Sequence, residues 1–196
     1  GVPAGVLNLI LASGRVASAM VQSPHVGALS FTGSVPVGKI IAEAATARGV
    51  KVQLELGGHN AAIVMPDVDP VFAAQQLTVG AMSGSGQKCT ATRRIITVGD
   101  AHERFVAALK IEVEALVVGP GGKAGVTTGP VISASAKNEI EAAVSDAVAQ
   151  GGKIIAQATL PAGSGFYVAP TVLEGYMTLR TCKEEILGPI STVMNV

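Results

Sequence analysis

The chain has 196 residues, of which 48% are hydrophobic and 14% charged, a composition typical of a globular protein with a buried core. Basic and acidic residues balance at 14 each, which argues against nucleic acid or an anionic membrane as a partner. Two cysteines outside any zinc-type pair, no secretory signal pattern and no bilayer-length apolar run favour a cytoplasmic protein with no disulfide framework and no metal.

The first third of the chain alternates predicted strands and helices. Short, mostly apolar runs predict strands at residues 7–11, 26–32 and 50–56. Helical spacing predicts helices at residues 14–22 and 35–48. This β-α-β-α-β order predicts a parallel sheet with helices over its faces.

The rest of the chain continues the α/β pattern. The predicted helices are residues 70–82, 102–116 and 134–150, with Asp67 and Asp69 where helix N-caps belong. Further strands are predicted at residues 61–65 and 93–98, around Ile154 and Val168, and from Ile190 to Met194. The fold class expected is therefore α/β.

A glycine-rich junction between a strand and a helix spans residues 31–38. Such a junction directs free backbone N–H groups and a helix dipole at an anion, and Gly33 and Ser34 suit a phosphate. An ordinary turn with a capping serine explains the same residues. The G-x-G-x-x-G pattern is absent, and the likeness to a P-loop ends at Ile40, where Mg²⁺ binding needs a hydroxyl side chain. The segment therefore argues against an NTPase.

Glu55 lies at the end of an apolar strand, in the run Leu54-Glu-Leu-Gly-Gly58. Poor solvation of a carboxylate favours its protonated form and suits a general base near neutral pH. A glutamate that points into solvent is the commoner case for a single example.

Cys89 lies in a glycine-rich loop, in the run Gly86-Gln-Lys-Cys-Thr-Ala91, with Lys88 before it and two arginines beyond. Nearby positive charge favours the reactive thiolate. The usual role of a free cysteine is that of a small buried hydrophobe. Cys182 is interpreted in this second way.

Five stretches together resemble the aldehyde dehydrogenase superfamily. They occur in the family's order, and the interval between Glu55 and Cys89 is similar to the family's spacing. The matching stretches are Phe31-Thr-Gly-Ser-Val-Pro-Val-Gly38, Leu54-Glu-Leu-Gly-Gly58, Gly86-Gln-Lys-Cys-Thr90, Gly165-Phe-Tyr-Val-Ala-Pro-Thr171 and Glu184-Glu-Ile-Leu-Gly-Pro189.

The resemblance implies oxidation of an aldehyde to a carboxylic acid with NAD or NADP. Cys89 would attack the aldehyde and give a thiohemiacetal, and hydride transfer would leave a thioester. Glu55 would activate the water that hydrolyses this thioester. The cofactor-binding residues implied are Gly33, Ser34, Gly38, Leu56, Gly57, Glu185 and Leu187.

Two positions depart from the family's pattern. Leu187 stands where a phenylalanine is usual, which retains an apolar cofactor contact but loses the ring. His59 stands where a lysine is frequent. We expect it either at the surface or in contact with site residues without touching the substrate or cofactor itself.

The resemblance also implies two domains. Residues 1–57 would be the C-terminal part of a coenzyme-binding domain, and residues 58–196 a truncated catalytic domain. Because the chain lacks an initial Met and ends within a predicted strand, we expect a fragment of a longer, homo-oligomeric enzyme. We expect no dehydrogenase activity from the 196 residues alone.

Other functions remain open. A truncated, inactive remnant would act at most as an assembly or binding module, but the presence of both Cys89 and Glu55 argues against decay. Acyl transfer to coenzyme A is a second alternative, against which Glu55 favours hydrolysis. The run around Cys89 is similar to dehydrogenases acting on semialdehydes such as 2-oxoglutarate semialdehyde. Arg93 and Arg94 could meet a substrate carboxylate, although a strand-edge or surface role is the commoner one.

Overall fold

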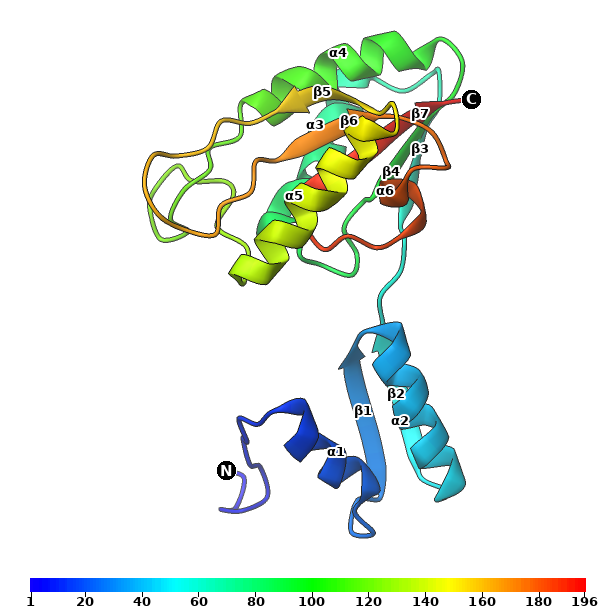
Figure 1. The fold of residues 1–196 in the computed structure, drawn as a ribbon, viewed down its shortest axis with the longest axis vertical. Helices are drawn as coiled ribbons and strands as arrows, with labels where there is room; N and C mark the ends of the chain where they lie inside the picture. The colour runs from blue at the N-terminus through cyan, green and yellow to red at the C-terminus, as the bar shows by residue number, and fades with distance from the viewer. The chain divides into compact units, whose positions relative to one another are not determined.

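A computed structural model describes residues 1–196, which form two compact units, Gly1–Gly57 and Gly58–Val196 (Figure 1). Both units combine helices with parallel strands, so the α/β class is confirmed. None of the helices combines the length and apolar character that crossing a membrane requires.

The smaller unit follows the predicted order from its first helix onward. Its elements are α1 (Gly14–Gln22), β1 (Ala28–Gly33), α2 (Val35–Ala47) and β2 (Lys51–Leu56). The two strands pair in parallel, with Ala28 opposite Lys51 and Gly33 opposite Leu56. The ends of both strands therefore lie beside the start of α2.

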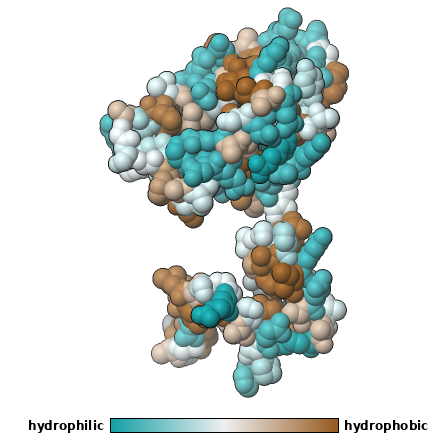
Figure 2. Space-filling model, in the orientation of Figure 1, coloured by the Kyte–Doolittle hydropathy of each residue, from teal (hydrophilic) through white to brown (hydrophobic).

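The strand predicted at residues 7–11 is wrong. These residues form no regular element, and the side chains of Leu7, Leu9 and Leu11 are exposed. A strand needs a neighbour for its backbone N–H and C=O groups, and the only sheet in this unit is the pair of β1 and β2. Figure 2 shows hydrophobic residues on the visible surface of the smaller unit.

Close packing of α2 on β2 depends on Gly38. A Cβ atom at this position would overlap the Leu56 side chain. Ile41 and Ala45 are the other two buried residues of the unit, and they lie on the same face of the helix. Periodicity therefore predicts the helix, but only part of its apolar face is buried, because Val37 and Ile40 are exposed.

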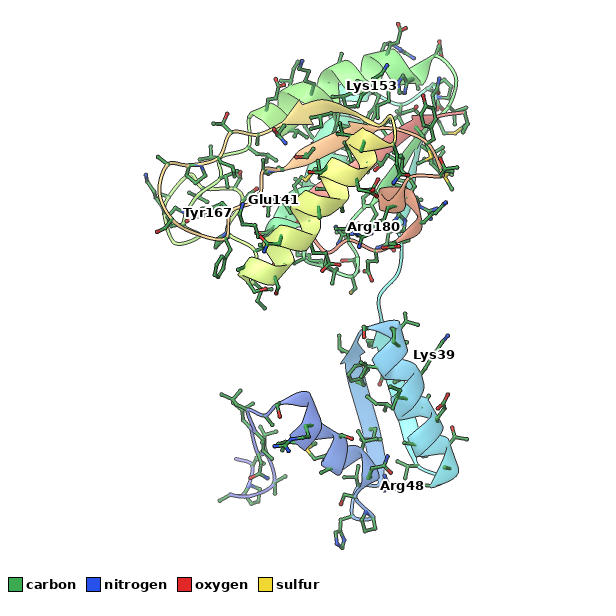
Figure 3. All side chains as sticks on the ribbon, in the orientation of Figure 1. Lys39, Arg48, Glu141, Lys153, Tyr167 and Arg180 are labelled. Carbon is green, nitrogen blue, oxygen red and sulfur yellow. The ribbon has the colours of Figure 1, made fainter.

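Arg48 joins the ends of the two helices of the smaller unit. It lies just beyond α2 (Figure 3), and its guanidinium donates to the carbonyls of Val21, Ser23 and Val26. These carbonyls belong to the end of α1 and the turn after it. A single side chain thus ties α1 to α2.

The larger unit contains a mixed sheet in the order β3-β4-β7-β6-β5. Neighbouring strands are parallel except for β5 and β6, which are antiparallel. The strands are β3 (Ala61–Val64), β4 (Arg94–Thr97), β5 (Lys153–Gln157), β6 (Thr171–Glu174) and β7 (Ile190–Asn195). The helices are α3 (Pro70–Met82), α4 (Ala101–Glu114), α5 (Ala134–Ala149) and α6 (Arg180–Lys183), with the short 3-10 turn η1 (Ser83–Gly86) after α3.

Alternate side chains of the strands enter cores on opposite faces of this sheet. Val172 and Val193 pack in one cluster with Phe105 of α4. The adjacent residues, Leu173 and Met194, pack in another cluster below α5 and α6. Figure 1 shows α5 on the near face of the sheet. The sheet is therefore covered on both faces, as expected for parallel strands.

One predicted strand near the end of the chain needs correction, and one short helix was missed. The strand expected around Val168 lies at Thr171–Glu174, because Pro170 has no N–H to donate to a neighbouring strand. Pairing begins where the Thr171 N–H donates to the Pro189 carbonyl at 2.9 Å. The short helix Arg180–Lys183 was not predicted. By contrast, Pro70–Met82 has the predicted bounds, and Asp69 caps it by accepting from Val71 and Phe72.

Candidate active site

The loop that carries Cys89 begins with a sharp left-handed turn. Gly84, Ser85 and Gly86 have φ values of 62°, 56° and 64°. Glycine adopts this conformation freely, whereas serine does so at a cost. The Ser85 hydroxyl donates to the Gly129 carbonyl at 2.9 Å, which helps to hold the strained residue in place. Cys89 follows in a turn, and its side chain is exposed.

The same loop lies directly against the backbone of Gly188. A Cβ atom at Gly86 would overlap the Gly188 carbonyl group and approach the nitrogen of Pro189. Gly86 is therefore required for this approach as well as for its positive φ. The contact brings the cysteine loop and the Glu184–Pro189 motif together within the larger unit.

Hydrogen bonds fix the loop on both sides of the thiol. The Asn60 side-chain amide donates to the Cys89 carbonyl at 2.6 Å and to the Ala91 carbonyl at 3.2 Å. The Gln87 side chain accepts from the Ile132 N–H at 2.9 Å. The backbone N–H of Cys89 itself has no acceptor within the chain. An exposed thiol and a free N–H donor thus share one residue.

Arg93 is not the surface residue that the sequence suggested. Its side chain is 3% exposed, and its guanidinium donates to the carbonyls of Gly86, Lys88 and Gly188. Burial lowers the pKa of Arg93, and the Glu185 carboxylate acts in the opposite direction. These donors are occupied inside the protein, so Arg93 is not available to a substrate carboxylate.

Glu185 lies beside this arrangement with an unused acceptor. Its Oε1 atom is buried and has no hydrogen-bond partner in the chain. Buried polar atoms are normally hydrogen-bonded, so this oxygen is a candidate for contact with a ligand hydroxyl. Leu187, two residues further, is 46% exposed.

Glu55 projects from the outer face of β2. Exposed and half-buried residues alternate along this strand, and Glu55 shares the exposed face with Lys51 and Gln53. Gln53 donates to its carboxylate at 3.1 Å. The expectation of poor solvation is therefore wrong within the smaller unit, because the period of the strand places Glu55 opposite the apolar face.

The strand-to-helix junction of the smaller unit leaves a donor unused. Ser34 is the N-cap residue of α2, but its side chain makes no capping hydrogen bond. Gly33 ends β1 immediately before it. The junction therefore retains the features of an anion site, with a free hydroxyl and a helix N-terminus. Gly38 packs inside α2 against Leu56, and Gly57 follows that strand.

His59 and Cys182 both support the fold. His59 Nε2 lies 3.2 Å from the Thr181 carbonyl, and the Arg94 guanidinium donates to the His59 carbonyl at 2.8 Å. Burial, reinforced by the Arg94 charge, lowers the pKa of His59. Cys182 is buried, and this burial raises the pKa of its thiol. A buried neutral thiol is unreactive, in agreement with the expected role of Cys182.

The structure thus brings together only some of the predicted site residues. Cys89, Glu185 and Leu187 belong to the larger unit, where the contact of Gly86 with Gly188 joins their segments. The other predicted residues, Gly33, Ser34, Gly38, Glu55, Leu56 and Gly57, belong to the smaller unit.

Sequence reasoning missed two residues that hold the cysteine loop, Asn60 and Arg93. The sequence did contain a signal for Arg93. Side chains alternate between the two faces of an extended chain, so Arg93 is expected on the same face as Ile95 and Thr97, both of which are buried. Asn60 had no comparable signal, since its contacts are to backbone carbonyls distant in sequence.

Comparison with known proteins extends over the whole chain. The sequence profile of the aldehyde dehydrogenase family matches residues 1–196. The α-ketoglutaric semialdehyde dehydrogenase of Bacillus subtilis is 37% identical over 207 residues, an alignment that covers 100% of this chain and 41% of that protein. The chain therefore spans less than half the length of this relative.

Solved structures give the same coverage. The methylmalonate-semialdehyde dehydrogenase of Oceanimonas doudoroffii matches with a TM-score of 0.96 at 32% identity, covering 100% of this chain and 41% of that one. The betaine aldehyde dehydrogenase of Staphylococcus aureus, solved in complex with NAD⁺, matches with a TM-score of 0.92 at 34% identity, covering 100% and 40%.

Proposed function

The chain belongs to the aldehyde dehydrogenase family, and on that premise we propose that the protein oxidises an aldehyde to a carboxylic acid with NAD(P)⁺. Cys89 is the nucleophile and Glu55 the base. The observation that carries the proposal is an exposed thiol on a loop whose backbone is anchored on both sides. Anchoring matters because a nucleophile reacts efficiently only when it is held in the attacking geometry.

The first half of the reaction takes place at Cys89. Its thiolate attacks the aldehyde carbon and forms a tetrahedral thiohemiacetal. The free backbone N–H of Cys89 is a donor for the oxyanion that develops on the former carbonyl oxygen. Bound NAD(P)⁺ supplies the acceptor for the hydride that the carbon loses. The carbon remains on the sulfur as a thioester.

The second half requires a base. Glu55 takes a proton from water, and the resulting hydroxide equivalent attacks the thioester carbon. The carbon–sulfur bond breaks, the carboxylic acid leaves and the thiol is restored. The Glu55 carboxylate is exposed near the end of β2 and is therefore accessible to water.

The chain offers suitable contacts for a dinucleotide. The unpartnered Oε1 of Glu185 suits a ribose hydroxyl, and the free hydroxyl of Ser34 before α2 suits a phosphate. Gly33, Leu56, Gly57 and Leu187 complete the proposed contacts, with Gly38 supporting them through its packing on Leu56. The chain spans 41% of its Bacillus relative, so cofactor use, homo-oligomeric assembly and cytoplasmic location are proposals for the whole protein.

The proposed substrate is a semialdehyde, an aldehyde that also carries a carboxylate. Support comes from relatives named as semialdehyde dehydrogenases. Arg93 does not supply the carboxylate contact, because its guanidinium is buried against carbonyls. A panel of aldehydes tests this class, and a preference of the full-length protein for neutral alkyl aldehydes would exclude it.

The function is tested by separating the two halves of the reaction in the full-length protein. Cys89→Ser should abolish aldehyde-dependent reduction of NAD(P)⁺. Glu55→Gln should permit one turnover and then stop, leaving an acyl group on Cys89 that intact-mass measurement detects. Cys182→Ser is the matched control and should retain steady turnover, because that thiol is buried.

Each variant also has an outcome that contradicts the proposal. Steady oxidation by Cys89→Ser would exclude the nucleophile, and full turnover by Glu55→Gln would exclude the base. Added coenzyme A separates hydrolysis from acyl transfer. An acyl-coenzyme A product instead of the free acid would support the transfer alternative.

A further inference from the structure

Arg93 is the only charged residue in the buried interior of the chain. Its guanidinium nitrogens serve two segments at once. Nη2 donates to the carbonyls of Gly86 at 2.6 Å and Lys88 at 3.0 Å, both in the cysteine loop. Nη1 donates to the carbonyl of Gly188 at 2.8 Å, in the segment that carries Glu185. The Arg93 side chain is thus a bridge between the loop that carries Cys89 and the segment that carries Glu185.

Such a bridge is energetically demanding. A buried charge loses its hydration, and no carboxylate hydrogen-bonds to this guanidinium in compensation. Its Nε atom has no partner at all. An apolar side chain would fill the space at lower cost if filling were the only requirement. The rigid fork of guanidinium donors, which a single ammonium group cannot reproduce, is therefore the feature that this position uses.

The backbone of Arg93 is hydrogen-bonded to the sheet. The carbonyl of Arg93 accepts from the Thr192 N–H at 2.9 Å and from the Ser191 hydroxyl at 3.1 Å, both on β7. Arg93 immediately precedes β4, and these two hydrogen bonds tie its backbone to β7. Motion of the cysteine loop is therefore restrained relative to the sheet.

We propose that Arg93 is a positioning residue that holds the Cys89 loop and the Glu185 segment in one fixed arrangement. The relevance of this arrangement to catalysis rests on the proposed roles of Cys89 and Glu185. Removal of the fork should release both segments together, because both lose a donor. A residue that merely stabilised the fold would lower stability without changing the conformation around the thiol in the folded chain.

Fluorine NMR of the 196-residue chain tests the thiol side of the bridge. Cys89 is alkylated with bromotrifluoroacetone in a Cys182→Ser background, so that a single probe reports on the loop. The parent chain should give one narrow resonance. Arg93→Met should broaden or split it, and Arg93→Lys should give an intermediate change. Arg94→Lys is the matched control and should leave the signal unchanged, because the Arg94 side chain donates only to the His59 carbonyl and makes no hydrogen bond to the cysteine loop.

Amide hydrogen exchange tests the other side of the bridge in the same samples. Peptides covering residues 185–190 should exchange about tenfold faster in Arg93→Met, because a charged donor makes a comparatively strong hydrogen bond. If Arg93→Met does not fold, Arg93→Lys decides the question by both measurements. An unchanged resonance and unchanged exchange in a folded Arg93 variant would overturn the proposal. Neither measurement depends on aldehyde oxidation, so failure of the bridge and failure of the proposed function remain distinguishable.

Discussion

The two units of the chain share the same alternation of helix and parallel strand, but they differ greatly in how many side chains they bury. In Gly1–Gly57 only Gly38, Ile41 and Ala45 are buried. In Gly58–Val196 helices cover both faces of a five-stranded sheet and enclose large side chains such as Phe105 and Leu173. A pair of strands has too little apolar surface to enclose a core, whereas a covered sheet forms one on each face.

This difference determines how precisely each unit can present chemical groups. The cysteine loop of the larger unit is fixed by Asn60, Arg93 and the close approach of Gly86 to Gly188. Glu55 of the smaller unit stands on an exposed strand face, and its side chain accepts a single hydrogen bond, from Gln53. The proposed nucleophile is thus held by contacts within its own unit, whereas the proposed base stands on an exposed strand face.

The largest expected effect comes from truncating the core of the larger unit. Phe105→Ala should lower the free energy of unfolding by about 3–5 kcal/mol, because it leaves a cavity at a fully buried ring. Phe31→Ala in the smaller unit should cost only about 1 kcal/mol, since that residue is only partly buried. Urea unfolding followed by hydrogen exchange reports on the two units separately. If both variants lost the same free energy of unfolding, the two units would not differ in how strongly burial stabilises them.

A smaller effect should appear as a pH dependence of the larger unit. The pKa of His59 is lowered in the folded chain, so the folded state resists protonation. The unfolded state takes up the proton as pH falls through the ordinary value of 6.5, and stability should decrease below that pH. His59→Asn should weaken this decrease.

Both tyrosines lie in the larger unit and the chain has no tryptophan, so intrinsic fluorescence follows its unfolding at each pH. His25 of the smaller unit is exposed and serves as the control position. An identical acid dependence in the parent chain and His59→Asn would show that His59 does not contribute.

The smallest expected effect lies in residues 7–11 of the smaller unit. Leu9→Ser should change the free energy of unfolding by less than about 0.5 kcal/mol, because the leucine is 88% exposed and makes no strand. Thermal unfolding followed by circular dichroism provides the measurement. A clear destabilisation would mean that the strand predicted there does form in solution.

Local features of the sequence were sufficient for most elements. Pro70–Met82 was predicted at its bounds because Asp69, Pro70 and the glycines after Met82 specify where a helix starts and ends. Predictions of strands failed where the position of the strand depends on a neighbouring strand to pair with. Residues 7–11 have the composition of a strand but no neighbour to pair with, and β6 starts beyond Pro170 because pairing with β7 begins there.

The candidate site divides in the same way. The sequence by itself determined which residues carry reactive groups, because a thiol, a carboxylate and a glycine-rich turn are properties of single positions and their near neighbours. Only the tertiary structure decided how the thiol is held, since Arg93 bonds a carbonyl 95 residues away and a carbonyl is present at every residue. Which carbonyl accepts from Arg93 depends on the path of the backbone in the folded chain, and no local sequence pattern specifies that carbonyl.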